Sequence, residues 1–170
     1  MAIQKFTVSR DDSIYEAWPD LVQTDSGKLI CLFSECRHHL DREDARIVLT
    51  ESLDRGRTWS PKRPLTEKGK RNSYFNCARI SKLRDGRLAV ICDKLTCFDK
   101  DDTALTYVWY GDSESITWSE PVILPFNGIV PDKLSELKNG RLIISNHSRN
   151  TENNQLEQHL WYSDDRGNRN

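Results

Sequence analysis

Three loops in the sequence are dense in side chains that bind ligands or transfer protons. They are ECRHHLDRED at 35–44, DKLTCFDKDD at 93–102 and NHSRNTENNQ at 146–155. Carboxylates, imidazoles and guanidinium groups at this density are typical of sites where a general acid or base works beside hydrogen-bonding groups. A solvated surface loop has a similar composition, so the loops by themselves leave both interpretations open.

The adjacent histidines of the first loop do not predict a metal site. Neighbouring side chains on a strand point in opposite directions, and no third ligand follows His38 and His39 at a suitable spacing. The five cysteines form no C-x-x-C pair and stand mostly in apolar runs. We therefore expect no metal and no cofactor, and we expect reduced, buried thiols rather than disulfides.

The composition argues against several kinds of partner. The chain has 170 residues and a formal net charge of −1, so we expect neither nucleic acid nor an anionic membrane surface as a partner. The N-terminus has no apolar signal segment, and no run of about 18 apolar residues occurs. These features predict an intracellular, cytoplasmic protein.

Two markers repeat along the chain and define the elements that must hold the polar loops. The first is SLDRGRTW at 52–59, which returns as GDSESITW at 111–118 and as SDDRGNRN at 163–170. The second is a glycine turn before an apolar strand, in DSGKLICLF at 25–33, RDGRLAVIC at 84–92 and KNGRLIISN at 138–146. Repeats with a period of some tens of residues are typical of propellers and solenoids.

Short β-rich segments accompany both markers, and little helical periodicity occurs. The clearest are Leu29–Phe33, Arg46–Thr50, Leu88–Cys92, Leu105–Tyr110, Leu142–Ser145 and Leu156–Tyr162. Each repeat is thus predicted to be a four-stranded antiparallel meander, the unit of a propeller blade. We predict an all-β propeller with blades at about 14–66, 74–125 and 129–170, the last one incomplete. In such a meander both markers lie at one end of the sheet and the polar loops at the other.

The SLDRGRTW pattern predicts a structural turn rather than a catalytic site. Asp and Ser side chains can bind backbone N–H groups of a tight turn, glycine can adopt a positive φ, and tryptophan can bury its ring. In the second copy Ser113 stands at the position of Asp54. The residues expected to build the three turns are Ser52, Asp54, Gly56, Thr58, Trp59, Thr117, Trp118, Ser163, Asp165 and Gly167.

These segments resemble the Asp-box, or BNR, repeats of the sialidase superfamily, whose fold is a six-bladed β-propeller. The resemblance extends over nearly the whole chain and implies three of the six blades. We therefore expect an N-terminal fragment or a truncated reading frame, with apolar blade faces that promote self-association. The resemblance also implies a carbohydrate ligand and an exo-acting glycoside hydrolase, with little activity in these residues alone.

Within the first loop, the resemblance implies roles for individual residues. The segment FSECRHHLDREDARIVL at 33–49 is similar to the sialidase segment in which a strand ends in Glu-x-Arg and a short loop holds the acid/base aspartate. Asp41 precedes Ile47 by the family's spacing, so it is the candidate general acid/base, with Asp44 as second choice. Arg37 occupies the arginine of Glu-x-Arg. The alternative for Asp41 is a solvated aspartate beside Arg42.

Other polar residues are expected near the mouth of the central channel or on the same rim as Asp41. Ala17 and Asn76 lie where first strands of blades open. The candidate substrate contacts are Arg37, His38, Arg79, Asp132 and Arg149. A surface position explains each of them equally well.

One stretch departs from the family pattern. Sialidases open the first strand with Arg-Ile-Pro, whose arginine binds the substrate carboxylate, whereas this chain has Ala17-Trp18-Pro19. The tyrosine nucleophile of the family and its glutamate partner belong to later blades. Two functions therefore stay open: a sialidase-like hydrolase, and a non-catalytic propeller that binds a glycan or a protein through the same face.

Overall fold

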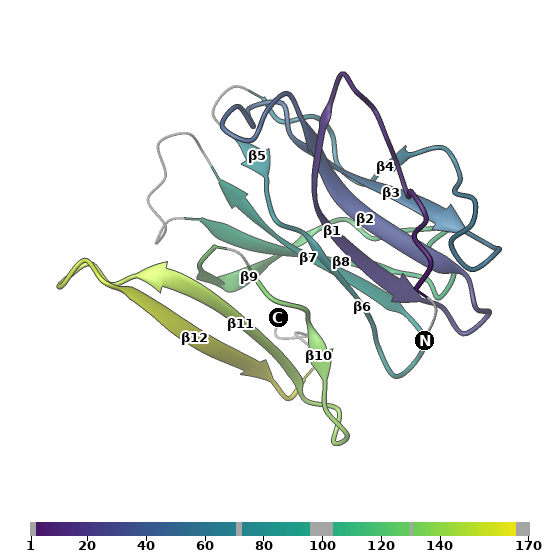
Figure 1. Ribbon diagram of the computed structural model, residues 1–170. Coiled ribbons are helices and arrows are strands. Elements are labelled where there is room, and N and C mark those ends of the chain that lie inside the picture. The colour runs from purple at the N-terminus through teal and green to yellow at the C-terminus, as the bar shows by residue number, and fades with distance from the viewer. Residues whose placement is uncertain (1–2, 71–72, 96–103, 130, 166–170) are drawn as a thin grey trace.

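The structure is a computed structural model that describes residues 3–70, 73–95, 104–129 and 131–165. Within these ranges the chain forms antiparallel β-sheets and no helix. Accordingly, no helix in this part of the chain is long and apolar enough to cross a membrane. Three sheets follow one another along the sequence, from purple-blue through teal to yellow-green in Figure 1. We call them blades 1, 2 and 3.

Each blade is a meander of sequential strands. Blade 1 has the order β1-β2-β3-β4, with β1 Tyr15–Gln23, β2 Leu29–Cys36, β3 Arg46–Ser52 and β4 Arg63–Pro64. In blade 2 two short strands pair with β7 in place of one first strand; the strands are β5 Tyr74–Phe75, β6 Arg79–Lys82, β7 Leu88–Leu95, β8 Leu105–Gly111 and β9 Val122–Asn127. Blade 3 contains β10 Ser135–Glu136, β11 Leu142–Arg149 and β12 Leu156–Ser163.

The strands form where apolar runs bury both faces of a sheet. In β2, Ile30 and Leu32 pack toward blade 2, while Cys31 and Phe33 pack on the opposite face, as alternation along a strand requires. All six expected strands are present. Several continue past their apolar runs into the polar loops, as β2 does to Cys36.

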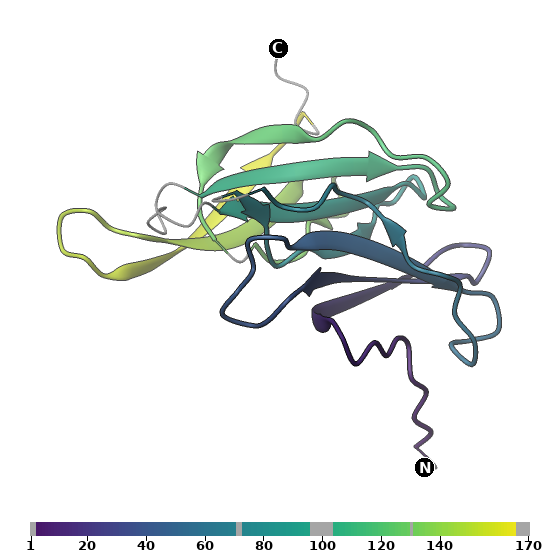
Figure 2. The same cartoon turned by 90° about the horizontal axis from the view of Figure 1, so that it is seen from above.

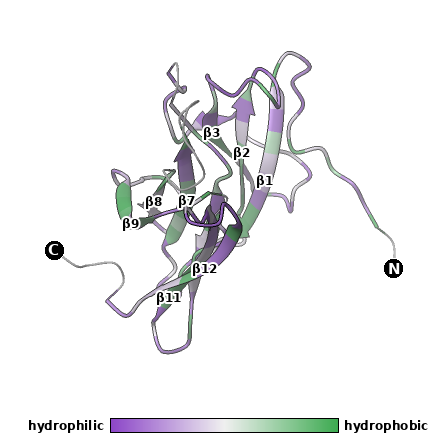
Figure 3. Cartoon of the chain, turned by 90° about the vertical axis from the view of Figure 1, so that its left-hand side faces the viewer, coloured by the Kyte–Doolittle hydropathy of each residue, from purple (hydrophilic) through white to green (hydrophobic). Residues whose placement is uncertain are grey.

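The blades pack face to face in series, with blade 2 in the middle (Figure 2). One cluster joins blades 1 and 2 and includes Ile30, Leu32, Ile47, Leu49, Ile80, Leu88, Val90 and Trp109. A second joins blades 2 and 3 and includes Ala89, Ile91, Val108, Leu134, Leu142 and Ile144. Burial of each large aliphatic side chain stabilises the fold by about 1.5–3 kcal/mol. Figure 3 shows the hydrophobic stretches within the strands and mostly hydrophilic loops between them.

The three glycine turns adopt one common geometry. Gly27, Gly86 and Gly140 have φ angles of 88°, 86° and 86°. In each turn the glycine N–H donates to the carbonyl oxygen three residues earlier, at 2.9–3.1 Å. A side chain at this φ would be strained, so the repeated glycine is required by the backbone of each hairpin.

The first SLDRGRTW turn is held by side-chain hydrogen bonds to its own backbone. Asp54 accepts the N–H and the hydroxyl of Thr58 at 2.8 and 2.7 Å, and Ser52 Oγ accepts the N–H of Gly56 at 2.8 Å. The indole of Trp59 donates to the carbonyl of Gly56 at 3.1 Å. The hydrogen bonds from Thr58 lower the pKa of Asp54 from 3.8 to about 2, so this carboxylate stays ionised as an acceptor.

The second turn corrects the alignment made from sequence. Ser113 was expected at the aspartate position, but Asp112, one residue earlier, accepts the N–H and hydroxyl of Thr117 at 2.5 and 2.7 Å. Ser115 adopts the positive φ there, at 61°. In the third turn Ser163 donates to Asp165 at 2.5 Å, and the predicted Gly167 lies outside the described residues.

Polar contacts join neighbouring blades at the end that carries these turns. Ser26, in the glycine turn of blade 1, donates to Glu114 in the aspartate turn of blade 2 at 3.0 Å. Asp20, in β1, accepts the backbone N–H of Ile80 in β6 at 2.9 Å. It also forms an ion pair of 2.8 Å with Lys133, in the segment before β10. Asp20 therefore links one strand of blade 1 to both following blades.

The N-terminal segment lies on the free face of blade 1. Residues 3–14 form no strand, and Val8 packs beside the cluster of Cys31, Phe33 and Val48. Four cysteines, Cys31, Cys36, Cys77 and Cys92, are buried free thiols, and Cys97 lies outside the described residues. Burial raises the pKa of Cys31 and of Cys77 to about 11.

Candidate functional site

The loop at residues 37–45 connects β2 to β3 at the end of blade 1 opposite the aspartate turn. A pair of backbone hydrogen bonds between His38 and Asp41, at 3.0 and 3.2 Å, folds the loop into a tight turn. The Asp41 side chain is 43% exposed, and its carboxylate lies 3.4 Å from the guanidinium of Arg37. The candidate acid/base is therefore solvent-accessible and has a cation beside it.

Arg37 holds two carboxylates of this loop. Besides Asp41, it contacts Asp44 through its side chain at 3.5 Å and through its backbone N–H at 3.3 Å. Its positive charge is thus compensated within the loop. Because an exposed ion pair of this kind contributes only about 0–1 kcal/mol, the arrangement can rearrange when a ligand binds.

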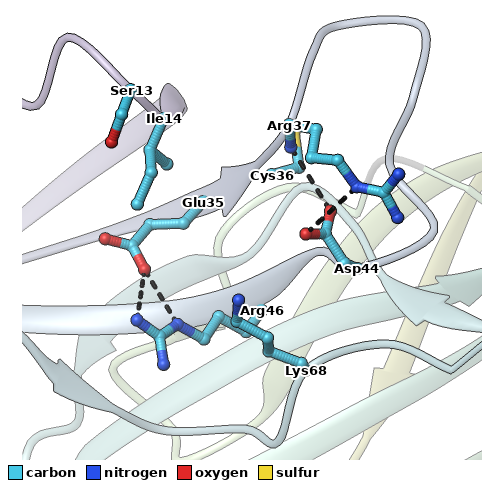
Figure 4. A pocket seen from close by; sticks show the side chains of 8 residues that line it. All are labelled: Ser13, Ile14, Glu35, Cys36, Arg37, Asp44, Arg46 and Lys68. Carbon is cyan, nitrogen blue, oxygen red and sulfur yellow. Dashed lines mark hydrogen bonds and ion pairs between the residues drawn. The ribbon is translucent and has the colours of Figure 1, made fainter.

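A small hollow lies behind this loop, on the outer face of blade 1 (Figure 4). Its volume is about 60 Å³, and it is lined by Ser13, Ile14, Glu35, Cys36, Arg37, Asp44, Arg46 and Lys68. Pockets that enclose small organic ligands measure roughly 300–1,000 Å³, so this hollow is too small to hold a sugar ring. The hollow is therefore not the candidate ligand site, and the exposed loop at 37–45 remains as the candidate.

Glu35, inside the hollow, is part of a buried ion cluster. Arg46 contacts one of its oxygens at 2.7 Å and Lys62 pairs with the other, while Lys62 also binds Glu16 at 2.8 Å. Burial by itself would raise the pKa of Glu35, but hydrogen bonds from Lys62 and Arg46 outweigh it and hold the pKa below its ordinary value. Glu35 is therefore an ionised structural carboxylate and is poorly suited to donate a proton.

Arg42 is the residue of this loop whose importance the sequence did not reveal. Its guanidinium lies over the rings of Trp18 and Tyr74, 5.2 and 5.7 Å from their centroids. It also donates to the side-chain carbonyl of Asn76 at 2.9 Å. Arg42 thus connects the Asp41 loop to β1 and to blade 2. Nothing in the sequence around Arg42 indicates this, because its three partners lie far away along the chain.

Asn76, expected near the channel mouth, continues this connection into the core. It is 4% exposed, and its amide donates to the carboxylate of Asp93 at 3.2 Å. Asp93 is fully buried at the start of the second polar loop. That loop, at 93–102, lies mostly outside the described residues, as 96–103 are not described.

The other candidate contacts lie on different elements. Arg79, at the start of β6, donates to the carbonyl of Ala78. Asp132, in the segment before β10, is exposed, and its side chain accepts the N–H of Lys133 at 2.7 Å. Arg149, at the end of β11, donates to the carbonyl of Asn154 at 2.8 Å. The structure gathers Arg37, His38 and Asp41 in one loop and distributes these three along blades 2 and 3.

The described residues contain no cluster of three or more His, Cys, Asp or Glu side chains arranged to hold a metal ion. In the loop itself, His38 accepts the backbone N–H of Leu40 at 3.2 Å, and His39 hydrogen-bonds the hydroxyl of Tyr15 at 3.2 Å. The two adjacent imidazoles therefore bind different partners.

Comparisons with known proteins show the fold. No protein-family model matches the sequence, and no curated protein matches it. Among solved structures, the Hadza microbial sialidase Hz136 superposes with a TM-score of 0.71 at 18% identity, over 90% of this chain and 36% of that one. Zg3597, a family 117 glycoside hydrolase of Zobellia galactanivorans, superposes with a TM-score of 0.69 at 13% identity, over 96% of this chain and 58% of that one.

A third match is the α-L-arabinanase of Penicillium chrysogenum complexed with arabinobiose, with a TM-score of 0.64 at 17% identity, over 88% of this chain and 47% of that one. The chain thus spans 36–58% of the length of these three proteins. The class that the fold defines is the β-propeller, as the repeats predicted. Within that class the chain is similar to several kinds of glycan-active enzyme, of which sialidases are one.

Proposed function

We propose that the rim at residues 37–45 binds carbohydrate, and that in a protein with further blades it serves a sialidase-like glycoside hydrolase that acts on a terminal sugar. Asp41 is the proposed general acid/base. The observation that supports this most directly is its position, solvent-accessible in a tight turn and 3.4 Å from Arg37, at the end of the blade opposite the structural aspartates. General acid/base catalysis needs a carboxyl that is accessible to the glycosidic oxygen, and the 43% exposure of the Asp41 side chain supports this role.

The neighbouring groups are suited to a ligand rich in hydroxyls. Arg37 can donate hydrogen bonds, and the two exposed histidines can donate or accept them, without first leaving a buried site. The similarity of the fold to a sialidase, an arabinanase and a family 117 glycoside hydrolase favours a glycan over other ligands. Glu35 is committed to a buried ion cluster, whereas Asp41 and Asp44 pair with the exposed Arg37 and are the proposed proton carriers.

The test is turnover of a panel of aryl glycosides by a protein that carries this chain and the remaining blades. Asp41→Asn is expected to lower kcat about 100-fold or more, because the acid/base is lost while the shape of the site is kept. Asp44→Asn is the matched variant, since Asp44 also binds Arg37. If Asp44→Asn abolishes turnover and Asp41→Asn does not, the assignment of the acid/base is wrong.

A second function is favoured by one specific observation. Ala17 stands where the resemblance leads us to expect a carboxylate-binding arginine, and Arg42 lies over the ring of the next residue, Trp18, 5.2 Å from its centroid. This arrangement is suited to a non-catalytic propeller that holds a glycan without cleaving it. Binding on a glycan array, with no sugar released from the bound glycans over a day, would favour this second function over the hydrolase.

A further inference from the structure

A β-bulge in β1 places Trp18 on the rim in a strained conformation. Ala17 pairs with Ser34 and Asp20 pairs with Leu32, so Trp18 and Pro19 together oppose a single residue of β2. The φ angle of Trp18 is 53°. A bulky side chain in this left-handed region costs on the order of 1–3 kcal/mol, and such residues persist where the surrounding structure holds them, often at ligand sites. Bulges also redirect side chains next to active sites.

The redirected indole completes a corner of three rings, Tyr15, Trp18 and His39, which we call the aromatic corner. Tyr15 stands nearly perpendicular to both other rings, with centroids 6.2 Å from Trp18 and 5.7 Å from His39. Trp18 and His39 lie 5.6 Å apart at 37°. A hydrogen bond of 3.2 Å between Tyr15 Oη and His39 Nδ1 holds these two rings together.

The aromatic corner is held in place from behind. Arg42 lies over the Trp18 ring and binds Asn76 of blade 2, which in turn binds the buried Asp93. The open side consists of Tyr15, which is 36% exposed, and of His39, which is also exposed. Rings that are fixed before binding lose little conformational freedom when a ligand packs on them.

The charges around the corner argue for an uncharged ligand. Arg37 is paired with Asp41 and Asp44, and Arg42 is engaged by Asn76 and two rings. A sugar carboxylate would have to exchange with Asp41 or Asp44 at Arg37, or displace the contacts of Arg42, whereas a neutral sugar requires neither change. A neutral sugar ring instead offers an apolar C–H face, which packs on aromatic rings, and hydroxyl groups, which can bind the polar groups nearby.

We infer that the aromatic corner is a stacking subsite for a neutral sugar ring, next to the Asp41 loop. This inference rests on the proposed carbohydrate-binding function and narrows its ligand to uncharged sugars. The exposed rings of Tyr15 and His39 would pack against the sugar, and the less exposed Trp18 would lie behind them. Asp41 and His38 lie in the same loop as His39, and their side chains are the proposed contacts to the sugar hydroxyls.

The experiment is binding of defined sugars to the full chain by NMR titration, followed through the indole N–H resonance that Trp18→Phe removes. The neutral probes are arabinobiose, xylobiose, cellobiose and lactose, and the acidic probes are N-acetylneuraminic acid and glucuronic acid. We expect at least one neutral probe to shift the Trp18 resonance. We also expect Tyr15→Ala to weaken its binding about tenfold or more, and Tyr15→Phe, which keeps the ring but loses the hydrogen bond to His39, to weaken it less.

The control is Tyr162→Ala, which removes a tyrosine that is 65% exposed on β12 of blade 3. If Tyr15→Ala binds the neutral probe as tightly as Tyr162→Ala does, the aromatic corner is not the subsite, although the carbohydrate function stands. Binding of the acidic probes alone would also overturn the inference and leave the function intact. If none of the sugars binds, both the inference and the proposed function fail.

Discussion

The carboxylate of Asp112 accepts both the backbone N–H and the hydroxyl of Thr117, the same two bonds that Asp54 accepts from Thr58 in the preceding blade. The two aspartates stand at different positions of the repeat, because Asp112 precedes the Trp of its turn by one residue more. The turn thus requires a carboxylate within reach of the threonine rather than an aspartate at one fixed position. The predictions below concern these turns, the contacts of Asp20 between blades, the ion cluster of Glu35 and two buried thiols.

Asp112→Ala should destabilise the protein, whereas Ser113→Ala should not. Removal of Asp112 leaves the N–H groups of Glu114, Ile116 and Thr117 without their acceptor, at a cost of about 1–2 kcal/mol. Ser113 is exposed, and its loss should change the free energy of unfolding by less than about 0.5 kcal/mol. Urea unfolding of both variants measures the difference. If Ser113→Ala destabilised the protein more than Asp112→Ala, the original alignment of Ser113 with Asp54 would be correct.

Asp54 should contribute stability that depends on pH. Its pKa is about 2 in the folded chain against an ordinary value of 3.8, so the folded state favours the ionised carboxylate. The contribution is therefore complete above the unfolded value and is lost as the pH falls from about 4 through about 2. The stability difference between the wild type and Asp54→Asn should shrink over that range. A difference that stays constant from neutral to acidic pH would contradict the stabilising role of the ionised carboxylate.

Asp20→Ala should loosen the packing of the blades against one another. The change leaves the backbone N–H of Ile80 without its acceptor and frees Lys133, so we expect a loss of about 1–3 kcal/mol in the free energy of unfolding. Asp12→Ala is the control, because Asp12 is 81% exposed and its ion pair is with the neighbouring, exposed Arg10. Equal stability of the two variants in guanidinium unfolding would show that Asp20 is not a link between blades.

Glu35→Gln should be destabilising. It removes a 3% exposed carboxylate that compensates Arg46 and Lys62. Because these two cations are 30% and 25% exposed, we expect a loss of about 1–3 kcal/mol in the free energy of unfolding. Asp85→Asn, which breaks the more exposed pair with Arg87, should cost less than about 1 kcal/mol. Thermal unfolding of both variants at neutral pH gives the comparison. A variant of Glu35 as stable as that of Asp85 would rule out a structural role for the cluster.

The thiols of Cys31 and Cys77 should resist alkylation in the folded protein. Burial raises the pKa of each to about 11, so only a minute fraction is the reactive thiolate near neutral pH. Peptide mass spectrometry after treatment with iodoacetamide should find both unmodified, and addition of urea should make both reactive. Equally fast modification with and without urea would mean that these side chains are accessible in the native state.

Much of the fold was predictable because its causes are local in the sequence. The glycine of each hairpin, the apolar runs of β2, β7 and β11 and the threonine–tryptophan ends of the aspartate turns each act on residues within a few positions. The meander is also predictable, because sequential strands joined by short turns pair antiparallel. The prediction failed at Asp112, where the hydrogen-bond geometry of the turn tolerates a shift of one residue that an alignment of letters does not.

The candidate site was predictable only in part. The sequence pointed to the loop at 37–45 and to Asp41, and chain connectivity alone places that loop opposite the aspartate turns. It gave no sign that Trp18 occupies a bulge or that Arg42 lies over it, and none that Asn76 and Asp93 continue the contact into blade 2.

The sequence by itself therefore determined the repeating all-β blades and the end of each blade at which its polar loops lie. The tertiary structure decided which side chains from different blades meet there, including the aromatic corner and the connection through Arg42. The physical reason is that turn and strand formation depend on neighbours along the chain. Ring packing and ion pairing, by contrast, depend on the twist and stacking of whole sheets, which brings residues from distant segments into contact.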